Sequence, residues 1–388
     1  MSQDRSSQDR GQPPPGALPA GGRLEIRVAW ADCPPGSLFA LASRQNPRRG
    51  FLFVSKVLGK HWPARPSAMA RAHRALAGKL HALRLDGPLV FIALAETAIG
   101  LGRAVFEEFC ARPGGPAALF TQTTRYSLGR KAVLGLDEAH SHARGHLVHE
   151  PADPGDRETF YGARTLVLVD DEISTGRTLA GLARAFLGLC PTLGAVALVS
   201  LTDWLDGERA GDLASGLPVG VSFVSLLKGS FEFFPDGRER AAETFRSEGD
   251  WRDKSPFLAR DHGRLGLRAG RGLPGLQAAL AGLGLDRGRP VRVIGTGEFL
   301  HEPFLLALAL EERGFDVLFQ STTRTPAMVG GAIGNRLRFA DNYHDGIDNF
   351  LYNHAGAGAA QNVIVYETRP LPADHDLPRL LGARTVFL

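Results

Sequence analysis

A stretch of thirteen residues, 166–178, constrains this chain most, because a buried-strand pattern in it ends in acidic residues and a loop of small residues. Residues 166–169 are apolar and half of them are β-branched, which is typical of a central parallel strand covered on both faces. Asp170 and Asp171 follow, and residues 174–178 lead into an amphipathic helix. Ligands of open α/β sheets bind beyond the carboxyl ends of such strands, and helix N-termini attract anions. The stretch therefore predicts a site for an anionic ligand.

The ligand should carry hydroxyls near the acids and a phosphate near the loop, because acids and an anion site side by side would repel a bare anion. A ribose 5-phosphate satisfies both conditions. The alternative is an ordinary strand-to-helix turn with an Asp and Ser cap. The residues that we expect to contact the ligand are Asp170, Asp171, Glu172, Ser174, Thr175, Gly176, Arg177 and Thr178.

At these residues the chain resembles the type I phosphoribosyltransferases. The resemblance implies that the acidic pair holds the ribose 2′- and 3′-hydroxyls of 5-phosphoribosyl 1-pyrophosphate (PRPP) and that the loop holds its 5-phosphate. Glu172 departs from the pattern, since many members carry an aliphatic residue there. Its side chain either adds a contact or points to solvent.

Composition indicates a soluble two-domain protein of the reducing cytoplasm. The chain has 388 residues, of which 44% are hydrophobic and 22% charged. Its apolar runs are too short to cross a bilayer, and its three cysteines form no Cys-x-x-Cys pair. A net charge of +4 is weak support for nucleic-acid binding, although the arginines of residues 44–49 could meet phosphates. We expect neither a nucleic-acid nor a membrane partner.

Strands alternate with helices along the chain, which predicts α/β modules with parallel sheets. We expect a disordered tail at residues 1–22, a phosphoribosyltransferase domain at 23–245, a linker at 246–273 and a second domain at 274–388. Within the first domain, the polar segment 126–156 is long enough for a mobile loop. Residues 219–228, with Phe231, Phe233 and Phe234, should form a subsidiary cap.

The second domain repeats features of the first. Residues 291–298 are again a strand and a small-residue loop with a glutamate, and residues 318–324 mirror 119–125. The strand at 362–366 stands where the acidic motif would be expected, yet it lacks an acidic pair and a glycine turn. The sequence thus predicts two Rossmann-like modules, the second a degenerate relative without PRPP binding.

This arrangement resembles a bacterial family of orotate-phosphoribosyltransferase-like proteins with a C-terminal TRSP domain, encoded near tellurium-resistance genes. The resemblance rests on residues 51–66, 95–98, 140–143, the Asp170 motif and 323–326. Thr325 replaces the serine of the TRSP signature and keeps its hydroxyl.

A second loop is expected to receive the pyrophosphate of PRPP. By resemblance it consists of Glu96, Thr97 and Ala98, whose small neighbours allow backbone N–H groups to reach an anion. Glu96 could hold magnesium or a substrate amine, or could cap the following helix. Mg²⁺ is the expected cofactor, carried in by the substrate and held at Asp170 and Asp171, because the sequence has no dedicated metal cage.

Further candidates lie in the polar segment and before the first helix. The resemblance implies that Arg125, Arg130 and Lys131 begin a loop that closes over the site, each with surface charge as its alternative. In the same segment His142 should contact pyrophosphate or donate a proton, which we favour over a zinc site. Lys56 and Lys60, four residues apart, could share a face and meet a second anion, or form a solvated helix edge.

The remaining candidates concern the acceptor and the second module. Phe233 could stack on a planar base or belong to the hydrophobic core. In the second module the candidates are Glu298, Thr323, Arg324 and Tyr343. No reaction can be assigned to them from the sequence.

We therefore predict a magnesium-dependent phosphoribosyltransferase of nucleotide metabolism that joins PRPP to a nitrogenous base-like acceptor and releases pyrophosphate. The alternative is a non-catalytic PRPP-binding regulator or sensor. The second module would process the product of the first or complete a dimer interface. We expect a homodimer.

Overall fold

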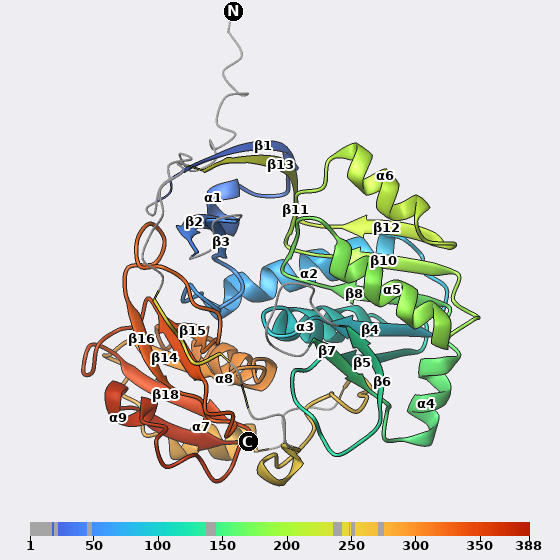
Figure 1. The fold of residues 1–388 in the computed structure, drawn as a ribbon. Coiled ribbons are helices and arrows are strands. Elements are labelled where there is room, and N and C mark those ends of the chain that lie inside the picture. The colour runs from blue at the N-terminus through green and yellow to red at the C-terminus, as the bar shows by residue number, and fades with distance from the viewer. Residues whose placement is uncertain are drawn as a thin grey trace, which may run out of the picture.

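The structure is a computed structural model that describes residues 18, 22–44, 49–136, 145–235, 243–247, 249, 253–270 and 275–388. Most of the expected N-terminal tail lies outside these residues. We call the elements α1–α6 and β1–β13 the first module, and the elements α7–α9 and β14–β19 the second module (Figure 1). In the described part of the chain, no helix is long and apolar enough to cross a membrane.

A five-stranded parallel sheet forms the centre of the first module. In spatial order its strands are β12 (Gly220–Val224), β10 (Ala195–Val199), β8 (Thr165–Val169), β4 (Leu89–Ala93) and β5 (Ala118–Gln122). The acidic pair follows β8, the middle strand, whose residues are all buried. The prediction of a central parallel strand is confirmed.

Helices bury both faces of this sheet. One face packs against α2 (Pro66–Ala82) and α3 (Ile99–Cys110). The other packs against α4 (Pro154–Tyr161), α5 (Arg177–Leu189) and α6 (Gly207–Ser215). In α5 the buried Leu179, Leu182 and Phe186 recur every three to four residues, so the amphipathic pattern directs this helix onto the sheet.

A smaller layer lies beyond the carboxyl end of β8 (Figure 1). It combines the four-stranded sheet β1 (Arg23–Ala31), β13 (Leu227–Phe234), β11 (Thr202–Asp203) and β9 (Glu172–Ile173) with α1 (Pro35–Leu38) and the hairpin β2 (Phe39–Ser43) and β3 (Phe51–Ser55). The expected cap is only partly correct, since residues 220–224 form the edge strand β12 of the main sheet instead.

The polar segment 126–156 is not one long loop in its described part. β6 (Ala132–Leu136) and β7 (His146–His149) form an antiparallel hairpin, and α4 begins at Pro154. Buried hydrogen bonds hold β7: His146 Nδ1 lies 2.8 Å from Thr123 Oγ1, and His149 Nε2 lies 3.1 Å from the Tyr126 carbonyl oxygen. Because His146 and His149 form these buried hydrogen bonds, β7 is packed into the first module.

The second module has a parallel sheet with the strand order of the first. Its strands are β15 (Val317–Ser321), β14 (Val291–Gly295), β18 (Gln361–Tyr366) and β19 (Arg384–Phe387), in the positions of β5, β4, β8 and β10. The hairpin β16 (Arg336–Ala340) and β17 (Asp348–Tyr352) stands where β6 and β7 stand in the first module. The remaining elements are α7 (Leu276–Gly282), α8 (His301–Glu312) and α9 (Leu377–Leu381). The topology agrees with the repeat that the sequence predicts.

The two modules share a hydrophobic core. Met69 on α2 and Ile99 on α3 pack with Phe304 on α8 and with residues of β14, β15 and β18. The approach is close: a Cβ atom on Gly100 would lie 2.9 Å from Leu300 Cβ. Ala64 of the first module pairs with Phe319 at the edge of β15 through two backbone hydrogen bonds of 2.9 and 2.8 Å. The second module is thus packed against the first rather than tethered to it.

The segment expected as a linker, 246–273, packs between the modules where the structure describes it. Arg264 in it is fully buried, and its guanidinium donates hydrogen bonds of 2.7 Å to both carboxylate oxygens of Glu367 and one of 3.2 Å to Glu298. Leu267 pairs with Phe120 through the backbone of β5. The segment joins both modules through buried polar contacts.

Candidate active site

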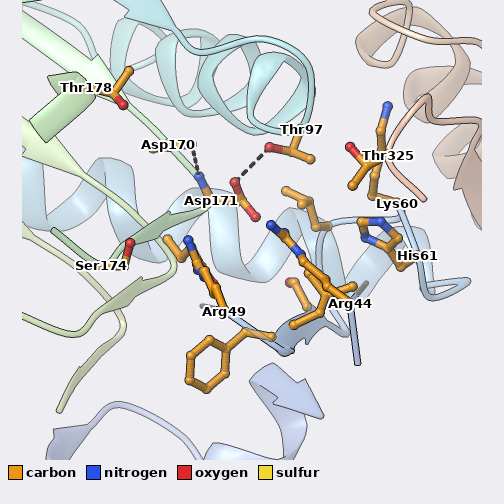
Figure 2. A pocket seen from close by; sticks show the side chains of 15 residues that line it. Arg44, Arg49, Lys60, His61, Thr97, Asp170, Asp171, Ser174, Thr178 and Thr325 are labelled. Atoms are coloured by element: carbon orange, nitrogen blue, oxygen red, sulfur yellow. Dashed lines mark hydrogen bonds and ion pairs between the residues drawn. The ribbon is translucent and has the colours of Figure 1, made fainter. Parts of the chain in front are cut away.

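The acidic pair stands at the carboxyl end of β8, where β4 and β10 also end. The backbone N–H of Asp171 donates a 2.9 Å hydrogen bond to Asp170 Oδ1, and the hydroxyl of Thr97 donates one of 2.7 Å to Asp171 Oδ1 (Figure 2). Burial, and next the charge of Asp171, raise the pKa of the Asp170 carboxyl well above its usual range. Because two neighbouring carboxylates repel each other, a cation or hydroxyl donors bound between them would stabilise the pair.

The loop after the acidic pair has the shape of an anion cradle. Gly176, with φ of +66°, is the N-cap of α5, and a Cβ atom there would lie 2.2 Å from Leu213 Cδ1. Glycine is favoured here, because a left-handed backbone and this close approach both disfavour a side chain. Ser174 and Thr178 on either side line the pocket described below. The N-terminus of a thirteen-residue helix thus faces the acidic pair together with two hydroxyls.

A pocket of about 220 Å³ joins these groups. In Figure 2, Ser174 and Thr178 lie at one side, Lys60, His61 and Thr325 at the other, and the acidic pair lies between them. The complete lining is Arg44, Arg49, Leu52, Phe53, Ser55, Leu58, Lys60, His61, Thr97, Asp170, Asp171, Glu172, Ser174, Thr178 and Thr325. Thr325 comes from the second module, so both modules form the pocket.

Several lining residues were missed by the sequence analysis. Arg44 follows β2, and Phe53 is on β3, so the β2–β3 hairpin covers the acidic pair. The Nε atom of Arg44 is buried without a hydrogen-bond partner, and the guanidinium points toward Asp171 (Figure 2). Burial, and next the charge of Arg49, lower the pKa of Arg44. The available signal was the arginine-rich run 44–49, which the sequence suggested could meet phosphates but did not connect to this site.

Glu172 does not point to solvent, since its carboxylate forms an ion pair with Arg49 across the pocket. Thr175 and Arg177 are exposed and lie outside the pocket lining. Of the expected ligand contacts after β8, the structure therefore brings Asp170, Asp171, Glu172, Ser174 and Thr178 to one cavity.

Glu96 is neither free for a ligand nor a helix cap. It is buried, and its carboxylate lies 2.6 Å from Lys60 Nζ and 3.4 Å from Arg324 Nε. Burial alone would raise the pKa of this carboxyl, but Lys60 and Arg324 hold that pKa below its usual range. The N-cap of α3 is Ala98, without a side-chain cap. The helix-cap alternative for Glu96 is therefore wrong, and in this structure its carboxylate is paired with Lys60 and Arg324.

The pairing of Lys56 with Lys60 is also wrong. No helix forms around them, and the two side chains take different partners. Lys56 Nζ donates to the Gly36 carbonyl oxygen at 2.9 Å at the surface. Lys60 is buried and donates to the Gly297 carbonyl oxygen at 2.7 Å and to Ser321 Oγ at 3.0 Å, both in the second module.

Phe233 lies behind the pocket wall rather than in it. Its ring packs 5.2 Å from Phe51, while the adjacent Phe53 lines the pocket and stacks on Trp204 with ring centroids 4.5 Å apart. The core alternative holds for Phe233, because β3 stands between β13 and the cavity.

The cations of the polar segment stay outside the pocket. Arg130 and Lys131 are exposed, and Lys131 Nζ lies 3.8 Å from Glu150. The backbone N–H of Arg125 donates a 2.8 Å hydrogen bond to Glu298. His142 lies outside the described residues.

Three of the four second-module candidates contact the first module. Glu298 accepts hydrogen bonds from Thr124 and Arg125, while Arg324 pairs with Glu96. Tyr343 stacks on Tyr126 with centroids 4.4 Å apart and donates to Glu367 at 2.6 Å. Thr323 pairs through its backbone with Phe350 in β17. Glu298, Arg324 and Tyr343 thus contribute to an interface between the modules, whereas the Thr323 contact lies within the second module.

Two family comparisons identify the chain. Residues 38–230 match the sequence model of a family described as "Phosphoribosyl transferase", which makes this a protein of the phosphoribosyl transferase class. Residues 262–381 match a domain described as "TRSP domain C terminus to PRTase_2". The chain belongs to the family of phosphoribosyl transferases that carry this TRSP domain.

Solved structures with weaker similarity include three proteins. Adenine phosphoribosyl transferase from Trypanosoma brucei, in complex with AMP, pyrophosphate and ribose-5-phosphate, is 14% identical over 49% of this chain and 76% of its own, with a TM-score of 0.34. Orotate phosphoribosyltransferase from Aeropyrum pernix is 17% identical over 42% and 72%, with a TM-score of 0.27. A hypothetical protein from Neisseria gonorrhoeae with bound ppGpp is 14% identical over 42% and 79%, also with a TM-score of 0.27. The assignment to the family rests on the two domain matches.

Proposed function

We propose that this protein transfers the 5-phosphoribosyl group of PRPP to a nitrogenous base-like acceptor and releases pyrophosphate. The observation that carries the proposal is the pocket in which an acidic pair lies between a helix N-terminus with hydroxyls and the loop of Thr97. Such a pocket matches the charge pattern of a sugar with an anion at each end.

The ribose would lie at the acidic pair. Its hydroxyls would donate to Asp170 and Asp171, and its 5-phosphate would meet Ser174, Thr178 and the N-terminus of α5. As the bond from C1 to the pyrophosphate oxygen breaks and a bond to the acceptor nitrogen forms, positive charge develops on the ring. The fixed negative charge of the pair stabilises that charge.

The pyrophosphate end would face Thr97 and Arg44. Arg44 is the suited cation because its guanidinium points into the pocket with a buried Nε that has no partner. Arg49 and Lys60 are engaged with Glu172 and Glu96. A guanidinium with an N–H group that has no hydrogen-bond partner can donate that N–H group to an anion of the ligand.

The acceptor would lie against β3. Leu52, Phe53 and Leu58 give this part of the pocket an apolar surface, and Trp204 supports the Phe53 ring from behind. A planar nitrogen heterocycle suits such a surface. His61 beside it stays neutral, because burial, with the charges of Arg44 and Lys60, lowers its pKa to about 3.

Magnesium fits the site as an ion held jointly with substrate. Asp170 and Asp171 would hold it, and a cation would offset the burial and the charge of Asp171 that together raise the pKa of Asp170. Within the described residues, no three His, Cys, Asp or Glu side chains are grouped to hold a metal by themselves. When bound, the ion would neutralise charge on the departing pyrophosphate.

The test is incubation of the full chain with PRPP, Mg²⁺ and a panel of nitrogenous bases, with pyrophosphate release as the readout. The matched variant Asp170→Asn keeps the shape and a hydrogen-bond acceptor for the Asp171 N–H, and we expect it to lose turnover and PRPP binding. No release by the wild type with any base, together with equal PRPP affinity of the two proteins, would refute the proposal.

A second candidate is a PRPP-binding regulator without turnover. It is favoured by one observation, namely that Arg130 and Lys131 lie exposed outside the pocket. Binding of PRPP by the wild type, loss of it in Asp170→Asn and no pyrophosphate release with any base would identify this alternative.

A further inference from the structure

The second module reaches the first module's site through a buried ion-pair cluster. Glu96, in the loop after β4, lies between Lys60 of the first module and Arg324 of the second. All three side chains are largely removed from water, with exposed fractions of 6% for Glu96, 1% for Lys60 and 14% for Arg324. Burial makes this cluster sensitive to loss of any partner, because an uncompensated buried charge is costly.

Arg324 has further polar partners in both modules. Its Nη2 donates a 3.0 Å hydrogen bond to the Tyr126 hydroxyl and lies 3.5 Å from Asp345, which pairs with Lys254 at 2.8 Å. The next residue along the chain, Thr325, lines the pocket (Figure 2). One short segment after β15 thus both holds Glu96 and forms part of the cavity wall.

The ion pairs of Glu96 with Lys60 and Arg324 affect residues of the proposed ligand site. Thr97 is the neighbour of Glu96 in the chain, and the Thr97 hydroxyl donates to Asp171 at 2.7 Å. A shift of Glu96 would move Thr97 and the start of α3 relative to the acidic pair. The position of these groups therefore depends on a residue of the other module.

We propose that residues 323–326 of the second module are a positioning element for the first module's site, with Arg324 holding the Glu96–Thr97 loop in its ligand-binding conformation and Thr325 closing one side of the pocket. The ligand assignment rests on the proposed function. The ion pair between Arg324 and Glu96 is present in the protein without ligand. The second module thereby contributes to binding although its own sheet carries no acidic pair.

The experiment compares Arg324→Gln and Arg324→Lys with the control Arg338→Gln in the full chain. Arg338 also belongs to the second module and pairs with a carboxylate, Asp348 at 2.6 Å, but it is half exposed and does not line the pocket. Two quantities are measured: amide hydrogen exchange of residues 95–99 without ligand, and the affinity for PRPP with Mg²⁺.

We expect Arg324→Gln to speed exchange at residues 95–99 and to weaken PRPP binding about tenfold, as for loss of one charge-assisted hydrogen bond. Arg324→Lys should keep part of the exchange protection and part of the PRPP affinity. Arg338→Gln should change neither the exchange nor the affinity. Unchanged exchange and affinity in Arg324→Gln would overturn the proposal, as would an equal effect of Arg338→Gln.

A second variant covers the case in which Arg324→Gln does not fold. Thr325→Phe should extend into the pocket and weaken PRPP binding at an unchanged melting temperature, and undiminished affinity would overturn the role of Thr325. If the wild type and Asp170→Asn both fail to bind PRPP, the proposed function is wrong. In that case, amide hydrogen exchange at residues 95–99 in Arg324→Lys still tests the role of Arg324. Faster exchange than in Arg338→Gln would support this role, and equal exchange would overturn it.

Discussion

The hydroxyl of Thr97 donates a 2.7 Å hydrogen bond to Oδ1 of Asp171, although the two residues follow different strands of the sheet. The bond fixes the expected pyrophosphate loop against the expected ribose site. It holds one carboxylate oxygen in place, so that the other remains available to a ligand.

Thr97→Val should weaken PRPP binding about tenfold, because a hydrogen bond to a charged group contributes about 1.5–3 kcal/mol. Thr97→Ser keeps the hydroxyl and should retain most of the affinity. Titration calorimetry with PRPP and Mg²⁺ measures both. Equal affinities of Thr97→Val and the wild type would show that this bond does not organise the site.

Gly176→Ala should destabilise the fold by about 2 kcal/mol and reduce PRPP affinity, because φ at Gly176 is +66° and a Cβ atom would collide with Leu213. Gly188→Ala is the matched control on the same helix, since nothing lies near its Cβ position. The control should be neutral or stabilising by about 0.5–1 kcal/mol. Urea unfolding measures both, and similar effects of the two variants would contradict the conformational argument.

His73 should make the fold less stable as the pH falls. Burial, and next the charge of Arg74, lower its pKa to about 3, so the folded state keeps the ring neutral while the unfolded state protonates near pH 6.5. The stability linked to the neutral ring is present above pH 6.5 and is lost as the pH falls from 6.5 toward 3.

His73→Phe removes this titration and keeps an aromatic ring against Phe304. Between pH 5 and 6, the slope of unfolding free energy against pH should decrease by about 1.2 kcal/mol per pH unit relative to the wild type. Urea titrations at several pH values give the slopes. Identical slopes would mean that His73 is protonated in the folded protein.

A fragment of residues 1–260 should not fold cooperatively. It would expose Met69 and Ile99, which pack against α8, and would leave Lys60 and Glu96 without their partners in the second module. Loss of a shared core exposes a large apolar surface and favours aggregation. A soluble fragment with a sharp thermal transition would instead show that the first module is autonomous.

The sequence predicted the sheet and its repeat well. Residues 165–169 and 291–295 are mostly apolar and bounded by small or polar residues, and such local patterns indicate where strands begin and end. The sequence also indicated a tight turn at Gly176, because a left-handed backbone and a close approach both favour glycine. These features depend on neighbours in the chain.

The opposite wall of the pocket was not predictable in this way. Arg44 and Phe53 come from a hairpin far from β8 in sequence, and nothing in their own neighbourhood signals that the hairpin folds over the acidic pair. The roles of Lys56 and Lys60 were wrong for the same reason. Spacing of four residues suggested one helix face, whereas burial against the second module separated the two side chains.

The sequence by itself determined the parallel sheets, the acidic pair and the loop of Gly176, because strand periodicity and backbone conformation are local properties. Only the tertiary structure decided which charges meet. Glu96 is committed to Lys60 and Arg324, and Thr325 enters the pocket, because a shared hydrophobic core brings the second module against the first. The free energy of burying that core depends on surfaces distant in the chain, which no local pattern records.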